Sequence, residues 1–278
     1  MKPYRLQTCW VLVLLAGLIA ACVRLTANTP TTSPSPSIVA TTPYPTLTPV
    51  PWDTGWSTLY PGVEIRQISV TTDFGDERLT LVRLEPGAVI FRVLYNPGVA
   101  YPVSVWARQT GAQVVCNGGY FTEDWYVTGL TISDGAVYGH PYGDFAGMFA
   151  VDASGQATVR WLHNQPYRPE EPLQQALQSF PLLVHPGGVL GYPPEGDEGQ
   201  IARRTMIAQD HTGRILILLA PRGFLSFSAL SQWLVASDLA LDVALNLDGG
   251  TSSGLWVADG PQTDSLVPVP SVLGVWLR

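Results

Sequence analysis

The stretch NLDGGTSSGLWV, from Asn246 to Val257, sets one carboxylate, Asp248, beside paired glycines and a run of hydroxyls. Glycine lets a backbone approach a ligand closely and adopt conformations that other residues avoid. An acid held in such a turn has a fixed, exposed position beside a backbone that a ligand can approach. We therefore expect a site at this turn. Its candidate residues are Asn246, Asp248, Gly249, Gly250, Thr251 and Ser252.

The same turn also fits the G-x-S-x-G pattern of a serine hydrolase, over residues 250–254. That pattern needs a strand, a sharp turn and then a helix, whereas Leu255–Val257 is typical of a strand. The hydrolase order also needs a histidine after the serine. All histidines come earlier in the chain, at His140, His163, His185 and His211. Both departures argue against a serine nucleophile.

A second stretch, CNGGYFTEDWYVTGL, again joins paired glycines to a polar residue after a predicted strand. Aromatic residues and two acids follow the glycines. A tight glycine turn beneath packed aromatic rings is the alternative to a binding site here. The candidate site residues of this stretch are Asn117, Gly118, Gly119, Tyr120 and Glu123.

A third stretch, ARRTMIAQD, places Arg203, Arg204 and Thr205 before an apolar strand. A guanidinium beside a hydroxyl makes a good clamp for a phosphate or a carboxylate. A solvated pair of arginines at the start of a strand explains the same residues equally well. The three stretches form one site only if the ends of their strands converge.

The elements that must position these residues are mostly predicted strands. Short alternating or apolar runs recur between turn signals. These runs are residues 63–69, 78–84, 89–94, 113–116, 129–132, 145–151 and 157–162. The segments TISDGAVYG and FAVDASGQATVRW are typical of hairpins.

Helices are expected at residues 102–110, at residues 170–179, and after Ser226 or Ser228. The last of these lies between two buried strands, RILILLAP and VALNLDGG, and the second strand leads into the turn of Asp248. The pattern predicts an α+β fold, with mixed or antiparallel sheets and a few covering helices.

The composition excludes several classes of function. Lys2 is the only lysine among 15 basic residues, so the body of the chain has neither a Schiff-base lysine nor a P-loop lysine. A net charge of −7 and a pI of about 5.0 argue against nucleic-acid binding. Scattered histidines argue against zinc. We expect no cofactor and no metal site, although a divalent cation held by carboxylates stays open.

The amino terminus predicts export and lipid anchoring. Lys2 and Arg5 precede an apolar run, residues 10–21, that ends in small residues before Cys22. This arrangement resembles a bacterial lipobox, so we expect residues 1–22 to be a lipoprotein signal peptide and Cys22 to be lipidated. An ordinary signal peptide or an uncleaved anchor is the alternative.

Residues 23–51 are rich in Pro, Thr and Ser and have no apolar period, which predicts an extended tether. Residues 52–278 then form one domain outside the cytoplasmic membrane, attached to it by lipid. With Cys9 removed and Cys22 lipidated, Cys116 is left without a disulfide partner, and we expect it to be a small buried residue.

In chain order, NGGYF, the TGL and SDG hairpin, SFPLLVHPGG, RRT before a strand, and NLDGGTSS resemble the phosphodiester glycosidase family. The animal member of that family removes N-acetylglucosamine from a phosphate diester on glycans. The resemblance runs from about Ala107 to the end of the chain. The sequence departs from the family pattern at Thr251, where a third glycine is common, and in its closing segment VPSVLGVWLR.

The resemblance implies hydrolysis of a sugar 1-phosphodiester in a glycan or glycolipid. Asp248 would act at the anomeric centre, and Arg204, with Arg203, would hold the phosphate. The N–H groups of residues 249–251, with the Ser252 hydroxyl, would form an anion-binding nest.

The resemblance also implies that Asn117 would hydrogen-bond the sugar or the phosphate, and that Tyr120 or Trp125 would stack on the sugar. A non-catalytic module that binds cell-envelope glycan is the competing interpretation. Such a module would keep Asp248 and Arg204 as well, so the sequence hardly separates the two.

Overall fold

The computed structural model describes residues 52–143 and 146–278. The predicted signal peptide, the tether and Cys22 lie outside these residues, so they stay predictions. The described residues belong to one compact unit, Pro49–Arg278. Within them, no helix is both long and apolar enough to cross a membrane.

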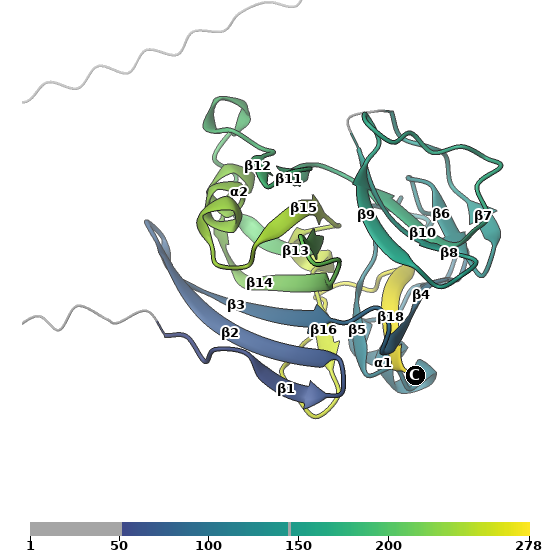
Figure 1. Ribbon diagram of the computed structural model, residues 1–278, viewed down its shortest axis with the longest axis horizontal. Coiled ribbons are helices and arrows are strands. Elements are labelled where there is room, and N and C mark those ends of the chain that lie inside the picture. The colour runs from purple at the N-terminus through teal and green to yellow at the C-terminus, as the bar shows by residue number, and fades with distance from the viewer. Residues whose placement is uncertain (1–51, 144–145) are drawn as a thin grey trace, which may run out of the picture. The chain divides into compact units, whose positions relative to one another are not determined.

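Three antiparallel sheets make up the unit (Figure 1). The first contains, in spatial order, β1 (Ser57–Tyr60), β2 (Val63–Thr72), β3 (Gly75–Leu84), β14 (Ile215–Leu225), β13 (Ala202–Asp210), β15 (Leu241–Asn246), β11 (Leu182–His185) and β12 (Val189–Leu190). The second contains β7 (Ala136–Tyr138), β6 (Thr131–Ser133), β10 (Leu173–Ser179), β8 (Gly147–Asp152) and β9 (Ala157–Trp161). The third contains β17 (Gln262–Thr263), β16 (Leu255–Val257), β5 (Val114–Asn117), β18 (Ser271–Leu277) and β4 (Val89–Tyr95).

Two α-helices and two short 3-10 helices complete the described elements. α1 (Val103–Thr110) begins after Pro102 and ends at Gly111, whose φ of 66° is the left-handed conformation that favours glycine. α2 (Phe227–Ala236) is capped by the Ser226 side chain, which accepts a hydrogen bond of 3.2 Å from the Ala229 N–H. The 3-10 helices are η1 (Pro194–Gly196) and η2 (Gly250–Ser252).

Much of the sequence-based prediction is confirmed. Both expected hairpins form, β6–β7 and β8–β9. Asp134 and Gly135 between β6 and β7 have φ values of 49° and 81°, as the favoured two-residue hairpin turn requires. The sheets are antiparallel and the covering helices are few, although strands dominate more than an α+β description suggests.

The helix predicted for residues 170–179 is wrong, because most of that segment is β10. Its Leu, Gln and Ala residues favour a helix locally, but β10 lies between β6 and β8. Two of its glutamines, Gln175 and Gln178, are buried there as hydrogen-bond acceptors. Gln175 accepts from the Val93 N–H at 2.9 Å, and Gln178 accepts from the Tyr142 N–H at 2.7 Å. Tertiary contacts therefore override local propensity.

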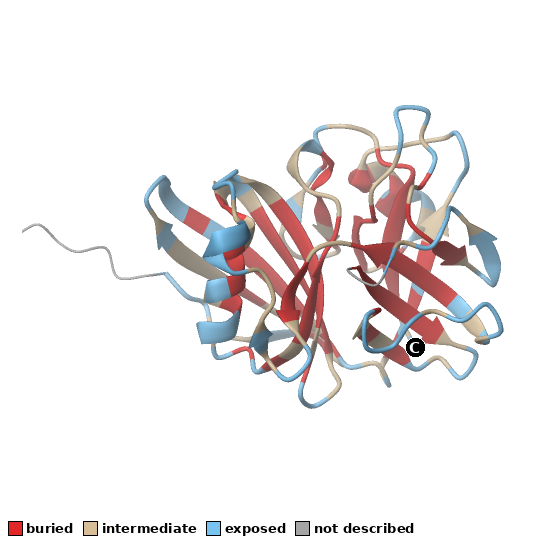
Figure 2. Cartoon of the chain, turned by 90° about the horizontal axis from the view of Figure 1, so that it is seen from above, coloured by how far each residue is buried: buried red, intermediate tan, exposed pale blue. Residues whose placement is uncertain are grey.

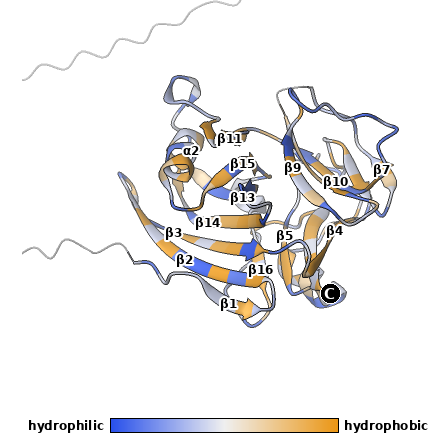
Figure 3. Cartoon of the chain, viewed as in Figure 1, coloured by the Kyte–Doolittle hydropathy of each residue, from blue (hydrophilic) through white to orange (hydrophobic). Residues whose placement is uncertain are grey.

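The three sheets share one core. A single buried cluster joins Val82 of the first sheet, Phe149 of the second and Leu273 of the third. Figure 2 shows the buried residues concentrated in the central strands and the exposed ones in the connecting loops. Strands such as β14 and β4 are mostly hydrophobic (Figure 3). Cys116 is fully buried in this core, which confirms the expected small buried residue, and burial raises its pKa to about 12.

Candidate active site

The two glycine-rich stretches meet backbone to backbone. β5 ends at Asn117, and β15 ends two residues before Asp248. The Asp248 N–H donates to the Gly118 carbonyl at 3.1 Å, and the Asn117 N–H donates to the Gly254 carbonyl at 3.3 Å. Segments more than a hundred residues apart in the sequence thus form one structural unit.

The Asn117 side chain holds this unit together. Its Nδ2 donates to the Asp248 carbonyl at 2.8 Å and to the Gly118 carbonyl at 3.2 Å, while its Oδ1 accepts from the Gly254 N–H at 3.1 Å. The residue is fully buried. The structure therefore gives Asn117 a positioning role for the turn of Asp248, in place of the expected contact with sugar or phosphate.

Gly118 and Gly119 are required by packing within the protein. A Cβ on Gly118 would lie 2.3 Å from Ser271 Oγ, and one on Gly119 would lie 2.9 Å from the Gln178 carbonyl oxygen. These neighbours belong to β18 and β10, which pass close to the end of β5. The backbone that approaches these glycines is therefore the chain's own, rather than a ligand as the sequence suggested.

Asp248 is half-buried at the start of its turn. Burial raises the pKa of its carboxyl above the ordinary value, although hydrogen bonds from the Ser252 side chain and the Gly249 N–H act in the opposite direction. The Gly249 N–H lies 2.8 Å from Asp248 Oδ1. Gly250 then adopts a φ of 59°, so the turn requires glycine there. The result is a fixed carboxylate in a desolvated position, as catalytic acids often have.

Arg204 is a buried cation on β13, with only 6% of its surface exposed. Its Nη2 donates to the Gln200 carbonyl at 2.7 Å, and its guanidinium lies 3.7 Å from the centre of the Phe227 ring. In the described part of the chain no carboxylate lies within ion-pair distance of it. Burial lowers its pKa. A buried charge without a counter-ion is costly, so this position favours binding of an anion.

Gly249 links the acid to the arginine. A Cβ on this glycine would lie 3.1 Å from the Arg203 carbonyl oxygen and 3.7 Å from Arg204 Nη1. The turn of Asp248 therefore passes directly over the guanidinium. A side chain at this position would crowd the space between the two groups.

Tyr120 lies beside both charges. Burial raises the pKa of its phenol, the charge of Asp248 raises it further, and the charge of Arg204 lowers it. Its hydroxyl donates to the Phe180 carbonyl at 3.1 Å and accepts from Asn246 Nδ2 at 3.1 Å. Its ring stacks on Phe180, with centroids 4.6 Å apart. Tyr120 and Asn246 thus form a rigid wall of the site.

Arg203 points away from Arg204, because neighbouring residues of a strand face opposite sides. Its Nη2 donates to the carbonyls of Ser253 and Asp264, at 2.7 and 2.9 Å. The predicted sharing of one phosphate between the two arginines therefore does not fit. Thr205 is fully buried, and the structure shows no hydrogen-bond partner for its hydroxyl among the described residues.

Two cavities open on this unit. One, of about 430 Å³, is lined by Phe121, Glu123, Trp125, Thr251, Ser252 and others, and so borders the turn of Asp248. The other, of about 190 Å³, contains Arg204, Phe227 and the acids Asp197 and Glu198. The Asp197 carboxylate accepts hydrogen bonds from the N–H groups of Ser228 and Gly199, at 3.1 and 3.2 Å, and its charge raises the pKa of Arg204, although the two side chains form no ion pair.

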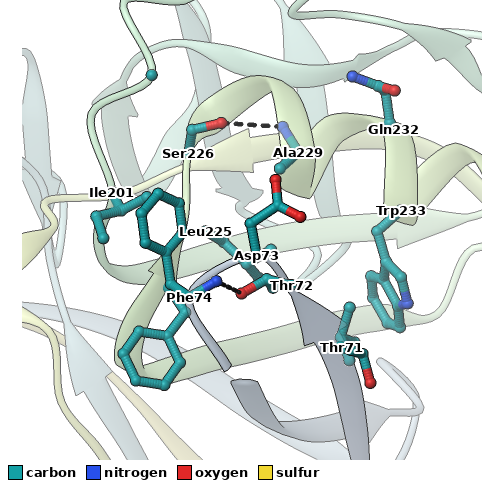
Figure 4. A pocket seen from close by; sticks show the side chains of 13 residues that line it. Thr71, Thr72, Asp73, Phe74, Ile201, Leu225, Ser226, Ala229, Gln232 and Trp233 are labelled. Carbon is teal, nitrogen blue, oxygen red and sulfur yellow. Dashed lines mark hydrogen bonds between the residues drawn. The ribbon is translucent and has the colours of Figure 1, made fainter. Parts of the chain in front are cut away.

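A further cavity, of about 530 Å³, lies between the β2–β3 turn and the start of α2. Thr72, Asp73 and Phe74 of that turn lie beside Ser226 and Leu225 (Figure 4). No arginine lines it, so it does not offer the charge pair of the candidate site. No group of three or more His, Cys, Asp or Glu side chains that could hold a metal ion occurs in residues 52–143 and 146–278.

The family model for phosphodiester glycosidases matches residues 110–276, which is more than half of the chain and includes all three candidate stretches. The chain belongs to the phosphodiester glycosidase family. No curated protein sequence matches it. The family assignment agrees with the resemblance found in the sequence and gives a glycosidase-type fold.

Solved structures share this fold. The catalytic domain of zebrafish N-acetylglucosamine-1-phosphodiester alpha-N-acetylglucosaminidase is 19% identical, with a TM-score of 0.61 over 80% of this chain and 86% of that one. A hypothetical protein from Synechocystis is 17% identical, with a TM-score of 0.59 over 80% and 63%. A putative exported protein from Burkholderia pseudomallei is 13% identical, with a TM-score of 0.53 over 72% and 74%. At these identities the likeness concerns the fold.

Sequence reasoning missed the residues that surround Arg204 and Tyr120. Phe227 begins α2 and was not singled out in the sequence, yet its ring lies against the Arg204 guanidinium. The Phe180 ring stacks on Tyr120, and the Phe180 carbonyl accepts hydrogen bonds from the Tyr120 hydroxyl and from Asn246 Nδ2. Neither has a local signal, because each contact joins residues far apart in the sequence.

Proposed function

We propose that this phosphodiester glycosidase domain hydrolyses a sugar 1-phosphodiester in a glycan or glycolipid outside the cytoplasmic membrane. The observation that carries the proposal is Arg204, a buried guanidinium without a carboxylate partner in the described residues, directly beneath the turn of Asp248. A sugar 1-phosphodiester brings one negative charge and one anomeric carbon, which are the two features that such a pair of groups can address.

The chemistry divides between the two side chains. The bond between the anomeric carbon and the bridging oxygen breaks, and the phosphate monoester leaves with the electron pair. This leaving group is a weak base, so it needs charge neutralisation, which Arg204 supplies, more than a strong general acid. Water provides the hydroxyl that ends on the anomeric carbon, and its proton is released.

The sugar side develops oxocarbenium character in the transition state. Asp248 stabilises that charge, attacks the carbon or accepts the proton of a water molecule that lies between them, and each role places the carboxylate on the side of the anomeric carbon. Tyr120 and Asn246 limit the movement of this region, because their hydrogen bonds and stacking fix the wall beside the acid. The cavity lined by Glu123 and Trp125 is the corresponding place for the sugar.

The location of the reaction follows from the amino terminus. A lipidated Cys22 and the tether of residues 23–51 would hold the domain at the outer side of the cytoplasmic membrane. Glycans and glycolipids of the cell envelope are then the accessible substrates, so we expect these as partners.

The test is a product assay on a panel of sugar 1-phosphodiesters that differ in sugar and aglycone, each with and without a chelator. We expect release of free sugar and phosphate monoester in equal amounts from at least one diester. Loss of activity with the chelator, restored by added Ca²⁺ or Mg²⁺, would reveal a metal requirement. If no diester is cleaved but one binds, the domain is a glycan-binding module instead.

A further inference from the structure

The loop Phe121–Val127, beside the candidate site, folds as a small rigid hairpin. Phe121 and Val127 form an antiparallel bridge. The Thr122 N–H donates to the Tyr126 carbonyl at 2.8 Å, and the Trp125 N–H donates to the Thr122 carbonyl at 3.0 Å. Trp125 has a φ of 67°, which lets the chain reverse within four residues. The loop therefore presents its side chains in fixed directions.

This loop is a wall between two cavities. Glu123 and Trp125 line the cavity of about 430 Å³ that borders the turn of Asp248. Tyr126 and Val127 line a second cavity, of about 510 Å³, and Thr122 lines both. The second cavity thus begins where the first one ends, and its volume is typical of a small-molecule site.

Tyrosines dominate the second cavity. Tyr95, Tyr126 and Tyr138 line it, together with Thr128 and His140. Tyr95 and Tyr138 meet edge to face, with centroids 5.0 Å apart and an interplanar angle of 74°. Tyr126 is 54% exposed, so its ring is available to a ligand. Such rings combine an apolar face with a hydroxyl at the edge.

The charge of the second cavity differs from that of the catalytic region. Among the described residues that line it, none carries a carboxylate or a guanidinium. An anionic ligand would find no counter-charge there, while Arg204 offers one in a separate cavity. The chemistry of tyrosine faces, hydroxyls and an imidazole suits a neutral ring with C–H groups on its faces and hydroxyls at its rim, which is a pyranose.

We propose that the tyrosine-lined cavity is a second sugar subsite, which binds a neutral pyranose of an extended glycan while the reacting sugar occupies the cavity beside Asp248. This inference rests on the proposed function, since it assigns the first cavity to the reacting sugar. It deepens that function by naming the substrate class as an oligosaccharide or polysaccharide, with two sugars bound on the two sides of the Phe121–Val127 loop.

The experiment measures binding of sugars without phosphate, so that it does not depend on turnover. The probes are a panel of neutral tetrasaccharides of N-acetylglucosamine, glucose and mannose, each compared with its monosaccharide by calorimetric titration of the full domain. We expect at least one tetrasaccharide to bind about tenfold more tightly than its monosaccharide. If no tetrasaccharide in the panel exceeds its monosaccharide, the second subsite is refuted.

The variant Tyr126→Ala locates the effect. We expect it to weaken the preferred tetrasaccharide about tenfold and to change the affinity of the monosaccharide less than twofold, because one stacking ring is lost. Tyr126→Phe keeps the ring and should retain most of the affinity. Phe74→Ala is the matched control, since Phe74 is 60% exposed and lies in a different cavity. Equal affinities for the tetrasaccharide in wild type and Tyr126→Ala would refute the assignment.

The outcomes separate this inference from the proposed function. A protein that cleaves no diester but loses tetrasaccharide binding in Tyr126→Ala has the second subsite without the catalysis. A protein that cleaves simple diesters but shows no preference for longer glycans has the catalysis without the second subsite. Thermal melting of each variant confirms that the fold is intact, and the exposure of Tyr126 makes unfolding by this substitution unexpected.

Discussion

Replacement of Asp248 by asparagine should abolish most turnover and leave the protein slightly more stable. The two side chains have nearly the same shape. In the wild type Asp248 Oδ1 accepts a hydrogen bond of 2.8 Å from the Gly249 N–H, and the asparagine Oδ1 can accept the same bond. The Ser252 hydroxyl can rotate to accept a hydrogen bond from the new amide. What disappears is a charge that burial disfavours, since burial raises the pKa of this carboxyl.

The sign of the stability change follows from that pKa. The folded chain holds the proton to higher pH than the unfolded chain, so unfolding releases it. The carboxyl therefore destabilises the fold progressively as pH rises from its ordinary pKa through its folded pKa, and the loss is complete above that value. Asparagine does not titrate. The advantage of the variant should thus appear at neutral pH and vanish in acid below the ordinary pKa.

The expected magnitudes are a loss of turnover on the order of a hundredfold or more and a gain of about 1 kcal/mol in the free energy of unfolding. For a domain of this size that gain raises Tm by about 2–4 °C. The assays are turnover of a cleaved diester and thermal melting at about pH 3, below the ordinary pKa of the carboxyl, and at about pH 7. Asp73→Asn, at an exposed turn acid, is the control and should change neither.

Retention of wild-type turnover by Asp248→Asn would refute the assignment of this acid to the anomeric centre, and Glu123 or Asp124 would be tested next. A fall of several degrees in Tm would refute the claim that the carboxylate is held at a cost to the fold. The two readouts are independent, so each part of the reasoning stands or fails by itself.

Three further predictions concern the arginines, the packing glycines and the anchor. Arg204→Lys should raise the KM for a diester about tenfold, because an ammonium cannot form two parallel hydrogen bonds to phosphate. Arg203→Lys should instead lower the free energy of unfolding by about 1 kcal/mol, because its contacts to two backbone carbonyls become weaker. Equal effects of the two substitutions on KM would contradict the assignment of substrate binding to Arg204 and of a structural role to Arg203. Gly119→Ala should destabilise the fold by about 1–3 kcal/mol, since a Cβ would lie 2.9 Å from a backbone oxygen, whereas Gly87→Ala, with open space around it, should change the melting curve little. Cys22→Ser should move the protein from the membrane fraction to the soluble fraction while its folded domain melts unchanged, and full membrane retention would argue against lipidation.

The local signals in the sequence predicted the elements that carry the site. The Asp-Gly turn after β6, the serine cap of α2 and the glycine turn at Asp248 each depend on a few neighbouring residues, so they were readable without a structure. The assignment of the chain to its family came from the order of such short motifs along the chain. Their convergence followed only as a requirement of a single site.

Side-chain roles were less predictable, because they depend on which strands become neighbours. Gly118 and Gly119 look like a ligand turn until β18 and β10, which lie far along the chain, are known to pass beside them. Asn117 looked like a sugar contact until its amide was found between two backbone segments. The separation of Arg203 from Arg204, in contrast, was predictable from the sequence, because neighbouring residues of a strand lie on opposite faces.

The charges of the site are arranged for a ligand rather than for each other. A direct ion pair between Asp248 and Arg204 would lower the pKa of the acid and raise that of the arginine. The structure shows the opposite directions for both, with burial as the leading cause in each case. The charges of Asp248 and Arg204 both shift the pKa of Tyr120, so the two groups nevertheless border the same region. Asp248 is half-buried and Arg204 is buried, and neither forms an ion pair within the described residues. A phosphate at the guanidinium and a positively polarised carbon at the carboxylate give each of them a partner of opposite charge. A sugar 1-phosphodiester provides these two partners one bond apart, which is why the separation of the pair supports that substrate.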